Sequence, residues 1–171
     1  IQRLRGARQA GARLPADKKI NNGVAPAVPD NEVVSFERAY SVKPNRTFAE
    51  GRQRLVIAGV ELNLVAVAGE TDDALYVWLP GRRVLFSGDN FYKSWPNAYA
   101  IRGTAYRDIR SWAEANDRML QEGAEFLVPG HTRPIIGKAA VAEALTDYRD
   151  AIRFVFDKTI EGMNKGLTPD E

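Results

Sequence analysis

The sequence predicts an α/β (α+β) fold in which β-hairpins are followed by a helix, a strand and a second helix. Three observations support this class: paired runs rich in β-branched residues, two stretches with helical periodicity, and turn residues between them. The first pair of runs covers residues 54–58 and 61–67, around a Gly-Val pair. The second covers residues 74–79 and 83–86, around Pro-Gly-Arg. Both pairs are typical of β-hairpins.

Two helices are predicted after the hairpins. Residues 109–122 carry their apolar side chains at three- and four-residue steps, and Gly123 ends the pattern. Residues 125–128 predict a short buried strand. A longer helix is predicted from about Lys138 to Met163, before Gly166. The stripe predicted to face the core of this helix consists of Val141, Leu145, Tyr148, Ile152 and Val155. This order of elements predicts a sheet with helices on one face.

The length of 171 residues suits one domain with its own core. Residues 1–50 contain turn signals without periodicity and predict an irregular connector, with short strands possible at 32–42 and 45–49. Residues 51–137 predict a sheet half-domain, and residues 138–171 predict a C-terminal helix that leads to a helical region absent from this sequence.

Both ends of the sequence suggest a piece of a longer protein. The chain opens on Ile1 rather than on methionine. It stops after Thr168-Pro169, which resembles the start of a further helix. We therefore expect additional chain before and after these residues.

The composition excludes several classes of protein and site. A formal net charge of +2 gives no electrostatic reason to expect nucleic acid or an anionic membrane as partner. A basic stretch over residues 1–19 suits a phosphate-binding arm, although a solvated loop or frayed helix is the favoured interpretation. The absence of Cys excludes disulfides and thiolate metal ligands, and no apolar run is long enough to predict a membrane span.

Three side chains that can bind a metal ion each follow a glycine where a predicted strand ends. They are Glu70, Asp89 and His131, and the last is the only histidine in the chain. Carboxylate oxygen and imidazole nitrogen bind zinc at about 2.0–2.2 Å, and two-metal hydrolases hold their ions about 3.5–4 Å apart. If the three strand ends meet at one edge of the sheet, they predict part of a metal site. Taken singly, each residue also suits a turn or an exposed surface position.

Two motifs resemble the metal-site motifs of the metallo-β-lactamase superfamily. They are residues 85–89 (LFSGD) and residues 129–132 (PGHT). Most members of that superfamily have histidine at the position of Glu70. A glutamate at this position resembles the pattern of the zinc-dependent alkylsulfatase branch. The spacing from Glu70 to Asp89 and the sequence of residues 97–103 (NAYAIRG) also resemble that branch. The resemblance covers most of residues 50–171.

This resemblance implies a fold, a cofactor and a partner. The fold would be the second half of a four-layer αββα sandwich, and its sheet would expose a face that the other half covers. Glu70 would bind one zinc ion and His131 a second, with Asp89 bridging the two. The helix from Lys138 resembles the one that leads into the alkylsulfatases' helical dimerisation region, which implies a homodimer. An exposed apolar sheet face is a second reason to expect self-association.

The sequence departs from the family pattern in two places. The bridging position in alkylsulfatases can be glutamate, and Asp89 is one methylene shorter. The His-x-His-x-Asp-His motif that supplies the other ligands is absent, because the chain has a single histidine. We therefore expect residues 1–171 alone to bind zinc weakly or not at all.

Arg102, Asn97 and Tyr99 are candidate substrate-binding residues. The planar guanidinium of Arg102 suits bidentate contact with sulfate or phosphate, although its position alone favours an ordinary surface salt bridge. The resemblance implies the sulfate-binding role. Asn97 would add a neutral hydrogen bond to the anion, and Tyr99, with Tyr92 and Trp95, would either line a channel for an alkyl chain or cover the sheet.

These expectations predict that the parent protein is an enzyme, a metal-dependent hydrolase of alkyl sulfate esters with two zinc ions. One alternative is another hydrolase of the same fold, acting on a lactone, thioester or phosphodiester; Glu70 and Arg102 argue against it. The other alternative is a non-catalytic, metal-free fragment, which the missing histidines favour for this chain in isolation.

Overall fold

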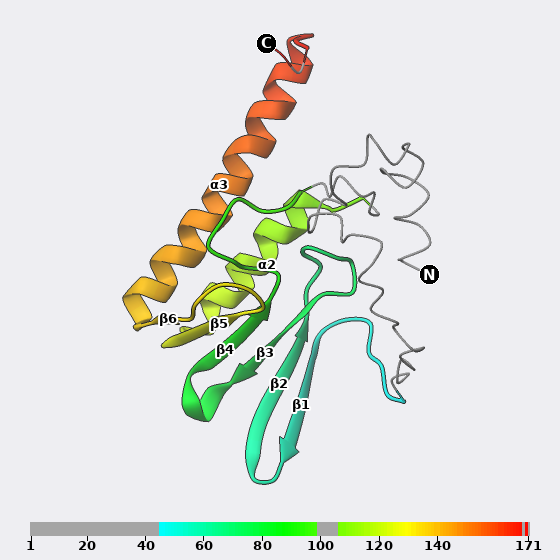
Figure 1. Ribbon diagram of the computed structural model, residues 1–171. Coiled ribbons are helices and arrows are strands. Elements are labelled where there is room, and N and C mark those ends of the chain that lie inside the picture. Colours follow the sequence, from blue (N-terminus) through cyan, green and yellow to red (C-terminus); the bar gives the residue numbers. More distant parts are fainter. Residues whose placement is uncertain (1–44, 99–105, 169, 171) are drawn as a thin grey trace, which may run out of the picture. The chain divides into compact units, whose positions relative to one another are not determined.

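A computed structural model describes residues 45–98, 106–168 and 170. Residues 48–98 and 107–171 form one compact unit, which contains the helices and strands described here (Figure 1). The elements in chain order are β1 (Arg52–Ile57), β2 (Val60–Ala66), β3 (Leu75–Leu79), the short 3₁₀-helix η2 (Pro80–Arg82), β4 (Val84–Gly88), α2 (Ile109–Gln121), β5 (Phe126–Pro129), β6 (Ile135–Ile136) and α3 (Lys138–Asn164). The strands form a single six-stranded sheet in sequence order.

The two predicted hairpins are confirmed. Strands β1 and β2 pair antiparallel around Ala58 and Gly59, whose φ angles are both positive at 49° and 78°. Two left-handed residues make a turn whose twist matches that of the flanking strands. Strands β3 and β4 also pair antiparallel, across η2, and the connection ends at Arg83 in the left-handed conformation.

After the hairpins the chain makes a crossover connection. Strand β4 leads into α2, and β5 then returns parallel to β4, with Leu85 opposite Leu127. Strand β6, which the sequence did not predict, pairs antiparallel with β5. Two residues are too few to show an alternating pattern in the sequence. The predicted short strand at residues 45–49 is not formed, since the structure has only bends and irregular backbone there. Residues 32–42 lie outside the described residues.

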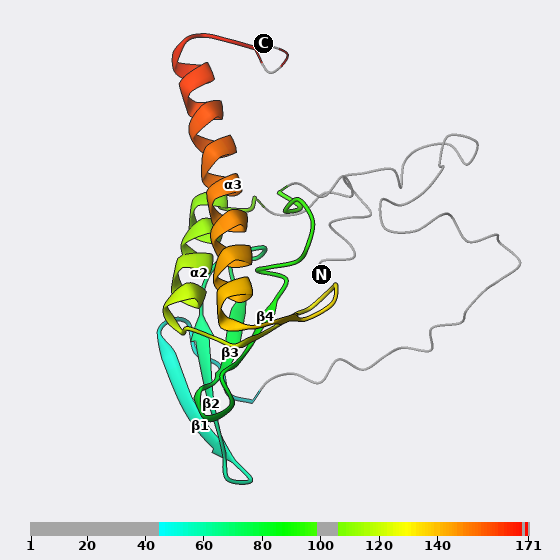
Figure 2. The same ribbon diagram turned by 90° about the vertical axis from the view of Figure 1, so that its left-hand side faces the viewer.

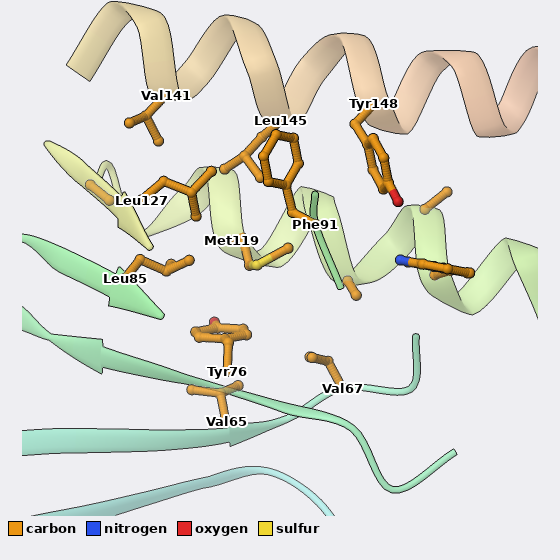
Figure 3. Packing of buried hydrophobic residues seen from close by; sticks show 14 of the residues in the cluster. Val65, Val67, Tyr76, Leu85, Phe91, Met119, Leu127, Val141, Leu145 and Tyr148 are labelled. Atoms are coloured by element: carbon orange, nitrogen blue, oxygen red, sulfur yellow. The ribbon is translucent and has the colours of Figure 1, made fainter. Parts of the chain in front are cut away.

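The core lies between the sheet and the two helices. Figure 3 shows side chains of the strands pointing toward α2, with α3 packed above it. The helices therefore cover one face of the sheet, as predicted. The fully buried apolar side chains include Tyr76, Leu85, Trp112, Met119, Leu127, Val141, Leu145 and Ile152.

Helix α2 begins at a side-chain cap and α3 extends past the sheet. The Asp108 carboxylate accepts hydrogen bonds from the backbone N–H groups of Arg110 and Ser111, which have no partner within the helix. The last turns of α3 project beyond the sheet in both views (Figures 1 and 2). The prediction that Val155 faces the core is therefore wrong: it is exposed, because the helix has left the sheet by this point.

The opposite face of the sheet carries apolar side chains that remain exposed. They include Phe86 on β4, Phe126 on β5 and Ile136 on β6. Phe126 stands opposite Ile136 across the β5–β6 pair. In the part of the chain that the structure describes, no helix is long and apolar enough to cross a lipid bilayer.

Candidate functional site

The strand directions bring the three predicted ligand loops to one edge of the sheet. Strand β2 is antiparallel to β3, and β3 is antiparallel to β4, so β2 and β4 point the same way. Strand β5 is parallel to β4. Glu70, Asp89 and His131 follow the carboxyl ends of these three strands. The order of the hairpins and the crossover therefore places all three at the same edge.

Glycines allow these loops to approach each other closely. A Cβ at Gly69 would lie 2.0 Å from Oδ1 of Asn90, and one at Gly130 would lie 2.4 Å from Oδ1 of Asp89. Either distance is shorter than any non-bonded contact allows, so a larger residue would require the neighbouring side chain to move. The backbone N–H of Gly130 also donates to the carbonyl of Gly88 at 3.0 Å. The glycines before the ligands thus bring the loops together.

Glu70 is held from two sides. Its backbone N–H donates to Oδ1 of Asn90 at 3.3 Å. Its carboxylate Oε1 accepts from Nη1 of Arg107 at 2.7 Å, and the two side chains are only 16% and 6% exposed. Burial raises the pKa of the Glu70 carboxyl, and the neighbouring Asp89 carboxyl acts in the same direction, while Arg107 opposes them. Glu70 is therefore a nearly buried carboxylate with a fixed orientation.

Asn90 connects this loop to the core. The Asn90 backbone carbonyl accepts from the Trp112 indole Nε1 at 2.9 Å and from Nδ2 of Asn116 at 3.3 Å. Both donors belong to α2 and are fully buried. The residue after Asp89 is thus fixed to the helix that covers the sheet.

Asp89 is near both of the other candidates. Its Oδ2 is 3.4 Å from Nε2 of His131, and its carboxyl is close enough to Glu70 to raise the pKa of that group. The His131 side chain is 74% exposed and that of Asp89 is 39% exposed. The structure therefore brings the three predicted residues together as two pairs that share Asp89.

The carboxylates and the imidazole are groups that bind metal ions, but too few of them lie together in the described part of the chain to hold an ion. Among the described residues, no three acidic, histidine or cysteine side chains lie close enough to hold one ion. Oxygen and imidazole nitrogen are the ligands that zinc accepts, and a shared carboxylate between two donors fits two ions better than one. The arrangement is thus compatible with part of a two-metal site whose other ligands come from elsewhere.

The structure describes only part of the predicted substrate-binding segment. Asn97 is half-buried, its backbone N–H donates to the Tyr92 hydroxyl at 2.6 Å, and its carbonyl accepts from Nη1 of Arg107. Tyr92 is buried against Trp112 of α2 and Tyr148 of α3, whereas Trp95 is exposed. Arg102 and Tyr99 lie outside the described residues.

Sequence reasoning missed Arg107 and Asn90. Both are buried polar residues that contact the Glu70 loop. Arg107 precedes the helix cap and follows no motif, so no local pattern distinguishes it from a surface arginine. Asn90 stands next to Asp89 and suggested only a turn residue.

Comparison with known proteins agrees with this architecture. The family model of the metallo-beta-lactamase superfamily matches residues 3–131. The chain belongs to this superfamily. It is 37% identical over 131 residues to a linear primary-alkylsulfatase of a Pseudomonas species, a match covering 76% of the chain and 25% of the relative. It is 29% identical over 170 residues to an (R)-specific secondary-alkylsulfatase of Pseudomonas, a match covering 96% of the chain and 25% of the relative.

A solved structure supports the same assignment. The stereoselective inverting sec-alkylsulfatase Pisa1 of Pseudomonas aligns with 96% of the chain and 26% of its own length, with a TM-score of 0.74 and 27% identity. The predicted fold class and the resemblance to the alkylsulfatase branch are thus confirmed. The chain spans about a quarter of the length of the relatives it matches.

Proposed function

We propose that the protein containing this chain is a metal-dependent sulfuric ester hydrolase that acts on alkyl sulfates. The observation that carries the proposal is that Glu70, Asp89 and His131 follow strands that end at one edge of the sheet, with Asp89 in contact with His131. It occurs in a chain whose curated relatives are alkylsulfatases. Water and the ester would give an alcohol and hydrogen sulfate.

The three residues of the site would act as metal ligands. Glu70 would bind one ion and His131 the other, and Asp89 would bridge them. When bound, two zinc ions would lower the pKa of a water molecule toward about 7 and so supply hydroxide near neutral pH. The chain has one histidine, so further ligands would come from outside residues 1–171. For this reason residues 1–171 alone would bind zinc weakly and show little or no hydrolysis.

Substrate binding would involve the segment after Asp89. Arg102 would contact the sulfate through its planar guanidinium, which also offsets negative charge. Asn97 would add a hydrogen bond from its side-chain amide, because its backbone groups already bond to Tyr92 and Arg107. Tyr99 would line the path of the alkyl chain.

We also propose that the protein forms a homodimer. The exposed apolar side chains on the outer part of α3 support this, since exposed apolar surface favours association. Light scattering over a range of concentrations checks it: a monomer at every concentration would contradict the proposal.

The test of the function uses the intact protein. We expect zinc-loaded protein to hydrolyse a medium-chain alkyl sulfate much faster than a lactone, and a chelator to remove the activity. Asp89→Asn should lower kcat/KM by a hundredfold or more if Asp89 bridges the ions, because the neutral amide is a poor metal ligand. Asp72→Asn, an exposed carboxylate in the same group of loops, is the control and should leave activity unchanged. Faster lactone hydrolysis than sulfate hydrolysis would instead favour another hydrolase of this fold.

A further inference from the structure

Arg107 is a cation buried beside the candidate site. Its side chain is 6% exposed, and the carboxylate that it contacts is Glu70. A charged group taken out of water is costly unless it is paired and hydrogen-bonded. Arg107 is therefore fixed by its contacts rather than free to move in solvent.

The same nitrogen of Arg107 makes a second contact. Nη1 donates both to Oε1 of Glu70 and to the backbone carbonyl of Asn97. The N–H of Asn97 is bonded in turn to the hydroxyl of the buried residue Tyr92. A continuous chain of hydrogen bonds thus runs from the Glu70 loop to Asn97, in the segment that precedes Arg102.

Among the described residues, the hydrogen bond to the Glu70 carboxylate is made at Oε1, and Asp89 stands near the same carboxyl. Oε1 accepts from Arg107, while the backbone N–H of Glu70 is held by Asn90. Both ends of the residue are thus fixed, so that Oε2 would be presented in one direction. An arginine suits this better than a lysine, because the two N–H groups of Nη1 are fixed in the guanidinium plane, whereas an ammonium is a flexible point charge.

We infer that Arg107 is a positioning residue, which orients Glu70 as a ligand through one oxygen and ties its loop to the Asn97 segment. The inference rests on the proposed function, because it assumes that Glu70 binds a metal ion. Residues that hydrogen-bond to metal ligands usually change metal affinity or activity by 10- to 100-fold when they are replaced.

The experiment compares variants of the intact protein by two measurements that do not depend on turnover. Zinc affinity is measured by competition with a chromophoric chelator, and the ligand geometry is followed by the visible absorption of Co²⁺-substituted protein. We expect Arg107→Gln to weaken zinc binding by about 10- to 100-fold and to change the cobalt spectrum. Arg110→Gln is the matched control and should change neither the affinity nor the spectrum. Arg110 is an exposed arginine in the first turn of α2, and its guanidinium lies over the ring of Phe156 in α3.

A second variant distinguishes an effect on zinc binding from a loss of the fold. Arg107→Lys keeps the charge and the stem, so we expect it to fold and still to bind zinc at least fivefold more weakly with an altered cobalt spectrum. In a Glu70→Gln background, Arg107→Lys should have no further effect on zinc affinity, because Arg107 would act through Glu70. A folded Arg107 variant with wild-type affinity and spectrum would overturn the inference.

The wild-type measurements separate this inference from the proposed function. If the wild-type protein binds zinc and Arg107→Lys binds it more weakly, the inference stands even when no alkyl sulfate is hydrolysed, and only the proposed substrate fails. If wild-type protein hydrolyses alkyl sulfates and the Arg107 variants bind zinc normally, only the inference fails. If the wild-type protein binds no zinc or cobalt, both are wrong.

Discussion

The Glu70 loop and the His131 loop stand at the same edge of the sheet but are held very differently. Glu70 is nearly buried, with hydrogen bonds to Asn90 and Arg107 on its two sides. His131 is 74% exposed and its described polar contact is with Asp89. The comparison teaches that contacts within this chain fix the Glu70 side chain itself. In the His131 loop they hold the neighbouring residues instead, since Gly130 donates to the Gly88 carbonyl and Oγ1 of Thr132 accepts from the Lys93 N–H.

Trp112 anchors the Glu70 loop through Asn90, and its removal is expected to have the largest effect. Trp112 is fully buried in α2, and its indole donates to the carbonyl of Asn90. Trp112→Ala should lower the free energy of unfolding by about 3–5 kcal/mol, because it leaves a large cavity and an unpaired carbonyl. Urea unfolding checks this, with the exposed Trp95→Ala as control, for which we expect a change of at most about 0.5 kcal/mol. Equal losses in the two variants would contradict the assignment of Trp112 as the anchor.

Gly69 and Gly130, which both lie very close to a neighbouring side chain, allow the Glu70 loop and the His131 loop to be compared directly. An added methyl group at Gly69 would meet the buried side chain of Asn90, while one at Gly130 would meet the partly exposed carboxylate of Asp89. We expect Gly69→Ala to destabilise the protein by about 1–3 kcal/mol, because the buried amide cannot easily move. Gly130→Ala should cost less than about 1 kcal/mol, since most of the overlap can be relieved by rotation of Asp89.

Thermal or urea unfolding measures both variants. Gly81→Ala is the control, because a Cβ there would meet no atom within 4 Å. A Gly130→Ala variant less stable than Gly69→Ala would reverse the comparison and show that the His131 loop is the more tightly packed one.

A smaller effect is expected at the start of α2, next to Arg107. Asp108→Ala removes the cap and should cost about 1 kcal/mol. The pKa of Asp108 is lowered, chiefly by the hydrogen bond from the Ser111 hydroxyl. Since the folded pKa lies below the unfolded value of about 3.9, the contribution is present above that pH and is lost as the pH falls through the folded pKa.

Urea unfolding between pH 2 and pH 7 tests this dependence. Asp108→Asn keeps a side-chain oxygen acceptor at every pH, so its stability should lack the part of the pH dependence that Asp108 provides. The same acid-induced loss in wild type and in Asp108→Asn would show that another carboxyl is responsible.

The smallest effect on stability is expected at His131 itself. The side chain is largely in solvent, so His131→Ala should change the free energy of unfolding by at most about 0.5 kcal/mol in the metal-free protein. Urea unfolding without metal provides the measurement. A loss above about 1 kcal/mol would mean that the His131 side chain contributes more to stability than its exposed contact with Asp89 accounts for.

The sequence predicted the elements well where a local pattern is long enough to be unambiguous. Hairpins, α2 and the buried part of α3 all carry clear periodicity, and Gly123 and Gly166 lie just beyond the helix ends in left-handed conformations. It failed for β6, which is two residues long and has no pattern of its own. Val155 continues the apolar stripe of α3, but whether a stripe is buried depends on where the sheet ends.

For the site, the sequence by itself determined which side chains follow glycines at strand ends, because both features are local. It also carried the family resemblance in the motifs around Asp89 and His131. Only the tertiary structure decided that β2, β4 and β5 point the same way, and that Asp89 contacts His131. It also brought Arg107 to Glu70 across 37 positions of the chain. Contacts between distant segments depend on how helices and strands pack, and no local pattern records that packing.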